Sequence, residues 1–110
     1  MVEFESYRSK GLNAYIAPIK ANGEADLNQA NYGKPKTEAD QAKAHRHKRH
    51  TVVVDESQLA DGYYVWKEAG GADFNKASYG WLEVRSGKIV QEWESKIEFR
   101  NAVAARVLNG

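Results

Sequence analysis

The stretch at residues 78–94, SYGWLEVRSGKIVQEWE, decides the predicted fold. Two runs rich in aromatic and β-branched residues flank the dipeptide Ser86-Gly87, and glycine supplies the positive φ that a two-residue hairpin turn needs. A hairpin turn of this kind also sets the register of the two strands. The predicted cross-strand pairs are Arg85–Lys88, Val84–Ile89, Leu82–Gln91 and Gly80–Trp93.

This register sorts the side chains of the hairpin into two faces, because side chains alternate along a strand. The drier face holds Gly80, Leu82, Val84, Ile89, Gln91 and Trp93. The wetter face holds Tyr79, Trp81, Glu83, Val90 and Glu92. The drier face predicts contact with a second apolar layer.

A helix is predicted directly after the hairpin, in residues 95–110. Ser95 and Glu98 form a capping box, and Gly110 stands where a helix stop is common. A broad apolar stripe is formed by Ile97, Val103, Ala104, Val107 and Leu108. We expect this stripe to pack on the drier face of the sheet.

Upstream of the hairpin, the pattern predicts further strands over residues 51–54 (TVVV) and 62–69 (GYYVWKEA), with a Gly-rich connection over 70–77. Residues 20–36 predict a loop with a helical turn. The pattern over 2–9 and 12–17 does not distinguish strand from helix. The predicted fold class is α+β, with one domain over 1–110 and a curved antiparallel sheet of four or more strands packed on one face by helices.

The composition narrows the class of protein. With 110 residues, 42% apolar and 28% charged residues, the chain is typical of one globular domain. No apolar run approaches the ~20 residues of a membrane span, and the N-terminus does not resemble a signal peptide, so we expect a cytoplasmic protein with no membrane partner. The absence of cysteine excludes disulfides and thiolate chemistry.

The segment AHRHKRH at residues 44–50 ends a predicted helix that Thr37 and Asp40 begin with a capping-box-like pair. Acidic residues at the start and basic residues at the end suit the helix dipole, so the favoured interpretation is a solvated helix end that leads into a strand. An alternative is a contact with nucleic acid or an acidic partner through Lys43, Arg46, Lys48 and Arg49. The spacing of the three histidines predicts no metal site.

Residues 49–108 carry a family resemblance. The strand, the Gly-Lys-Ile-Val turn, the strand ending in an aromatic residue and the Ala-rich helix resemble SnoaL-like members of the NTF2-like superfamily. The N-terminal 36 residues depart from the family pattern, since they lack its amphipathic helices. The resemblance implies a pocket between helices and sheet and a homodimer; family members include isomerases, cyclases and non-enzymatic binders, so the fold does not choose the function.

The density of aromatic residues suggests two surfaces. An apolar wall with one polar group predicts that a small apolar or amphipathic ligand binds at Trp66, Gln91 and Trp93. The wetter face predicts a dimer interface at Tyr79, Trp81 and Val90. No catalytic residue is predicted, because no pair of acids or nucleophiles has a spacing typical of a reaction, and no cofactor motif is present.

Overall fold

The C-terminal half of the chain forms strands close to their predicted bounds. In this computed structural model, which describes residues 1–68 and 78–109, the strands are β5 (His50–Val54), β6 (Gly62–Glu68), β7 (Ser78–Arg85) and β8 (Lys88–Trp93). Ser86 and Gly87 have φ values of 53° and 72°, which is the backbone of the predicted two-residue turn. The predicted Gly-rich connection at 70–77 lies outside the described residues.

The N-terminal 36 residues form four short strands. Where the pattern does not distinguish strand from helix, the structure has β1 (Val2–Ser6) and β2 (Tyr15–Pro18), with the 3-10 helix η1 (Ser9–Gly11) between them. The predicted loop at 20–36 contains the helical turn η2 (Leu27–Gln29), but also strands β3 (Asn31–Tyr32) and β4 (Lys34–Pro35). These two strands were not predicted, because a strand of two residues is too short to show the alternation of apolar and polar side chains.

The strands form two antiparallel sheets with orders β1-β5-β4 and β3-β2-β6-β7-β8. Only Gly33 separates β3 from β4, so one short extended segment serves an edge of each sheet. The Gly33 N–H donates to the Ala14 carbonyl at 2.8 Å. A methyl group at Gly33 would overlap the Val52 side chain, so glycine is needed where the chain passes from one sheet to the other.

The main core lies between the two sheets. The three-stranded sheet contributes Phe4, Val52 and Val54, and the predicted drier face of β7 contributes Leu82 and Val84, all of them buried. Trp66 stands beside this core, with its ring centroid 5.9 Å from that of Phe4. The layer that covers the drier face is therefore a second sheet, whereas the apolar stripe predicted a helix there.

The register of the hairpin matches the prediction only next to the turn. Arg85–Lys88 and Val84–Ile89 pair as predicted, and then the structure pairs Glu83 with Gln91, Leu82 with Glu92 and Trp81 with Trp93. Val90 is the extra residue of a β-bulge. Because a bulge inserts one residue into one strand, it exchanges the faces of all later side chains on that strand. Gln91 and Trp93 thus lie on the face of Trp81 and Glu83.

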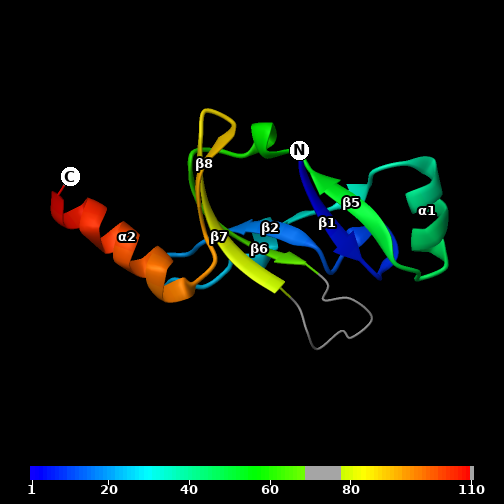
Figure 1. Cartoon of the computed structure of the whole chain (residues 1–110), viewed down its shortest axis with the longest axis horizontal. Helices are drawn as coiled ribbons and strands as arrows, with labels where there is room; N and C mark the ends of the chain where they lie inside the picture. The colour runs from blue at the N-terminus through cyan, green and yellow to red at the C-terminus, as the bar shows by residue number, and fades with distance from the viewer. Residues whose placement is uncertain (69–77, 110) are drawn as a thin grey trace.

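Helix α2 (Lys96–Asn109) begins beside this second face and extends beyond the β8 edge of the sheet (Figure 1). The Glu98 N–H donates to the Ser95 hydroxyl at 3.4 Å, as the capping box predicts. In the predicted apolar stripe, Ile97 is 71% exposed and Ala104 is also exposed, whereas Val103 is half-buried. The buried Phe99, which is outside the predicted stripe, packs the helix on this face. The side chains of Val107 and Leu108, and Gly110, lie outside the described part of the chain.

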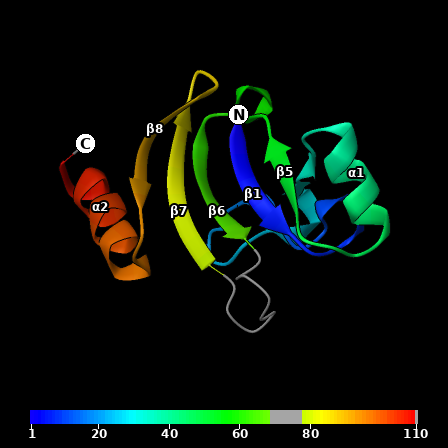
Figure 2. The same cartoon turned by 45° about the vertical axis from the view of Figure 1, so that its right-hand side comes forward.

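Helix α1 (Glu38–His45) lies at the other end of an elongated molecule that measures 49 × 29 × 21 Å (Figures 1 and 2). Figure 2 shows α2, β8, β7 and β6 following one another, with β1 and β5 in front and α1 beyond them. The architecture is α+β with an antiparallel sheet of five strands that carries a helix on one face. The predicted class is confirmed.

Candidate functional site

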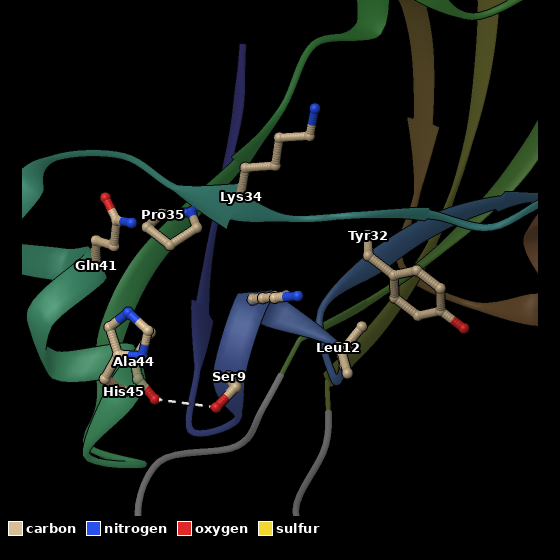
Figure 3. Close-up of a pocket in the computed structure, with 9 residues that line it drawn as sticks. Ser9, Leu12, Tyr32, Lys34, Pro35, Gln41, Ala44 and His45 are labelled. Atoms are coloured by element: carbon tan, nitrogen blue, oxygen red, sulfur yellow. Dashed lines mark hydrogen bonds between the residues drawn. The ribbon is translucent and has the colours of Figure 1, made fainter.

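A hollow of about 570 Å³ opens between α1, η1 and the β3–β4 segment (Figure 3). We call it the α1 pocket. Its lining consists of Ser9, Lys10, Leu12, Tyr32, Lys34, Pro35, Gln41, Ala44 and His45. The three elements come from residues 9–12, 32–35 and 41–45, so the pocket exists only in the folded chain.

A tight turn at η1 shapes the floor of the α1 pocket. Lys10 and Gly11 have consecutive positive φ values of 59° and 68°. A methyl group at Gly11 would overlap the Gly33 carbonyl oxygen, so the backbones of η1 and the β3–β4 segment are in direct contact. The Ser9 hydroxyl donates to the Ala44 carbonyl at 3.3 Å (Figure 3), and this bond connects η1 to α1.

The walls combine apolar surface with basic groups. Leu12 is 53% exposed and Tyr32 is 40% exposed, although both are large apolar side chains. The Tyr32 ring meets Tyr15 edge-on at 5.9 Å, and burial, followed by the nearby Tyr79 and Tyr32 hydroxyls, raises the pKa of Tyr15. The basic side chains of the lining are Lys10, Lys34 and His45, and none of its described residues carries a carboxylate.

Polar bonds fix α1 against β5. The Thr37 hydroxyl accepts from the Asp40 N–H at 3.2 Å and donates to the Asp40 carboxylate at 2.7 Å, which confirms the predicted capping pair. The same carboxylate accepts from the Thr51 N–H at 3.0 Å. The hydrogen bond from Thr51, and then that from the Thr37 hydroxyl, lower the pKa of Asp40.

The three residues predicted to bind a ligand do not share one wall. Trp66 lies beside the inter-sheet core, Gln91 is exposed on β8, and Trp93 is buried under Phe99 with ring centroids 5.2 Å apart. A second hollow of about 440 Å³ brings Trp66 and Trp93 together but not Gln91. Its other lining residues are Glu92, Glu94 and Glu98. Glu92 takes the place of the predicted amide, because the bulge at Val90 exchanges the faces of Gln91 and Glu92.

The three residues predicted to form an interface also separate. Tyr79 and Val90 are exposed. Trp81 is half-buried, and its ring stacks on Phe99 of α2 at 6.4 Å with an interplanar angle of 20°. Part of the predicted interface is therefore covered by the chain's own C-terminal helix.

The basic segment ends α1 as the favoured interpretation predicts, but the helix stops at His45 and not at residue 50. His47 has a φ of 52°, and a positive φ just after the last turn is a common helix stop. Lys43, Arg46 and Lys48 are exposed. Arg49 forms an ion pair with Glu5 on β1, so only three of the four cations proposed to bind nucleic acid lack an acidic partner of this kind.

His50 is the one histidine of the basic segment that is buried. Its Nδ1 lies 2.7 Å from the Lys48 carbonyl oxygen. Across the described residues, 1–68 and 78–109, no group of three histidines, aspartates or glutamates is arranged to hold a metal ion. Within the same residues, no helix combines the length and apolar character that crossing a bilayer requires.

Comparison of the chain with protein-family models, with curated proteins and with solved structures found no match. The similarity of residues 49–108 to SnoaL-like proteins therefore stays a prediction. The α1 pocket was missed because only its α1 wall comes from a predicted helix, whereas the other walls come from a predicted loop and from residues near the start of the chain whose pattern is ambiguous. The only local signals were the glycines at 11 and 33, and neither points to a ligand by itself.

Proposed function

We propose that this chain binds a small amphipathic molecule in the α1 pocket. The observation that carries the proposal is a hollow of about 570 Å³ at which two large apolar side chains, Leu12 and Tyr32, stay exposed. Small-molecule sites commonly measure about 300–1,000 Å³ and combine apolar walls with a few polar groups. Here Gln41 and His45 lie on the α1 side, and Leu12 and Tyr32 lie opposite them (Figure 3).

The proposal concerns binding and includes no reaction. A serine nucleophile needs a base within hydrogen-bond reach, and the Ser9 hydroxyl instead donates to the Ala44 carbonyl. The ligand class is the one that the sequence predicts, a small amphipathic molecule held between helix and sheet. The location differs, because the pocket lies beside α1 and not beside Trp66 and Trp93.

Fluorescence titration with N-phenyl-1-naphthylamine, a neutral apolar probe, tests the proposal. The variant Leu12→Asn/Tyr32→Asn removes the apolar wall, and we expect its probe affinity to fall about tenfold. The control Leu27→Asn changes a leucine that is also 53% exposed but lies outside the lining, and it should bind as the wild type does. Equal affinity of the wild type and the double variant would overturn the proposal.

The alternative, a nucleic acid or an acidic partner at the basic segment, makes a different prediction. It requires salt-sensitive binding of such a partner that is lost when Lys48 and Arg49 are both changed to glutamate. The ion pair between Arg49 and Glu5 weighs against it, since a base held by a carboxylate must break that pair to contact phosphate.

A further inference from the structure

The two hollows of the molecule differ in the charge of their walls. Among the described residues, the α1 pocket is lined by Lys10, Lys34 and His45 and by no carboxylate. The described lining of the hollow at the opposite end includes Glu92, Glu94 and Glu98 and no base. The chain as a whole has 16 lysines and arginines against 15 acids, so its net charge is close to zero. The overall charge therefore does not explain why the charged groups of one pocket are all basic. The basic groups gather where the apolar wall is exposed.

Lys10 occupies a backbone conformation that a lysine rarely adopts. Its φ of 59° and ψ of 17° are left-handed, a conformation that is unfavourable for a residue with a Cβ. Glycine or asparagine would suit the same turn at a lower cost. An uncommon residue in such a conformation at a pocket points to a role for its side chain, and Lys10 is one of the residues that line the pocket.

The basic groups of the pocket are not held by acids in the way that their neighbours are. Lys36, two residues after Lys34, forms an ion pair with Glu3, and Arg49 forms one with Glu5. Among the described residues, no salt bridge includes Lys10 or Lys34. In Figure 3 the Lys34 ammonium points away from Leu12 and His45, so it reaches a ligand only when its flexible four-carbon stem turns back toward the pocket.

We propose that the ligand of the α1 pocket is an amphipathic anion. Its flat apolar body would lie against Leu12, Tyr32 and Pro35, and its carboxylate, sulfonate or phosphate group would be bound by Lys10, with Lys34 and His45 at the rim. This inference rests on the proposed function, because it specifies the ligand of the same pocket. The anionic group follows from charge complementarity, and the flat body follows from the exposed leucine and tyrosine.

A pair of matched probes tests the inference: 1-anilinonaphthalene-8-sulfonate and N-phenyl-1-naphthylamine, which differ only in the sulfonate. The full-length variant Lys10→Asn/Lys34→Gln removes two charges, and asparagine tolerates the left-handed backbone. We expect the variant to lose affinity for the sulfonate about fivefold, as for two exposed charge pairs, with unchanged affinity for the neutral probe. Raising the salt from 50 to 500 mM should weaken sulfonate binding to the wild type alone.

The control Lys20→Asn removes one charge from an exposed position outside the pocket lining and should bind both probes as the wild type does. Near-UV circular dichroism establishes that each variant is folded. An unchanged ratio of the two affinities in the double lysine variant would overturn the inference and leave the proposed function standing. If the Leu12 and Tyr32 substitutions leave the affinity for both probes unchanged, or if neither probe binds, the inference and the proposed function are both overturned.

Discussion

The two helices are attached to the body of this molecule by different forces. Helix α1 is held by hydrogen bonds, from Thr51 to Asp40 and from Ser9 to Ala44, and Ala44 is its buried residue. Among the side chains that the structure describes, the aromatic Phe99 holds helix α2. Phe99 contacts Tyr63, Trp81 and Trp93 with ring centroids 5.7, 6.4 and 5.2 Å away.

This difference explains why the α1 pocket is open beside the first helix. Hydrogen bonds fix a helix at single points and leave the surface beside it uncovered, whereas aromatic rings fill the space between a helix and a sheet. The α1 contact therefore leaves Leu12 and Tyr32 exposed. The α2 contact covers Trp81 and buries Trp93. A helix with little apolar surface can form a pocket wall because it does not fill the pocket.

The largest expected effect follows from Phe99→Ala. Truncation of a buried phenylalanine costs about 3–5 kcal/mol in a protein core, and Phe99 is the buried residue among the described side chains of α2. We expect α2 to detach while the inter-sheet core stays folded. Hydrogen exchange should show loss of protection confined to α2 amides, with a red shift of tryptophan fluorescence. Unchanged protection in α2 would contradict aromatic docking.

A smaller effect is expected from Asp40→Ala, which removes the polar attachment of α1. The Thr37 cap on the backbone N–H of residue 40 remains, but the Thr51 N–H loses its carboxylate partner, and an unpaired part-buried donor costs about 1–3 kcal/mol. Urea denaturation at pH 7 measures the change in the free energy of unfolding. The control Glu38→Ala changes an exposed acid of the same turn and should cost less. Equal losses for the two variants would mean that first-turn charge, and not the bond to Thr51, holds the helix.

The pH dependence of the stability difference between the wild type and Asp40→Ala distinguishes the attachment of α1 from that of α2. The folded state lowers the pKa of Asp40 below its ordinary value of 3.8, so the ionised carboxylate is the form that stabilises the fold. Its contribution is complete above about pH 5 and is lost as the pH falls through the lowered folded value. The stability difference between wild type and Asp40→Ala should therefore shrink below pH 4. Attachment of α2 through Phe99 rests on contacts between aromatic rings and should not depend on pH in this way. If the stability difference between the wild type and Asp40→Ala stays constant down to pH 2, the charge of Asp40 does not hold α1.

The smallest effect is expected from Ile97→Gln on α2. Ile97 is 71% exposed, and exposed substitutions usually change stability by less than about 0.5 kcal/mol. The predicted apolar stripe would instead make this a costly change, because it assigns Ile97 to the contact with the sheet. Thermal unfolding of Ile97→Gln beside Phe99→Ala separates the two accounts of how α2 docks.

Local patterns in the sequence determined both helices and the strands from residue 50 onward, but not the four short strands before them. The turn at Ser86-Gly87, the cap at Thr37 and Asp40, and the cap at Ser95 and Glu98 each depend on neighbours within four residues. All three are present in the structure as predicted. The α+β class and the antiparallel strands follow from the same local signals, because turn chemistry and side-chain period act over short distances.

Only the tertiary structure decided which faces meet and where the pocket lies. The bulge at Val90 has no sequence signal, yet it moves Trp93 from the core face to the α2 face, since one inserted residue reverses every later side chain. The contact of Gly11 with Gly33, and of Ser9 with Ala44, joins segments 22 and 35 residues apart in the sequence. Packing energies between such distant segments are absent from any local pattern, and these contacts create the α1 pocket.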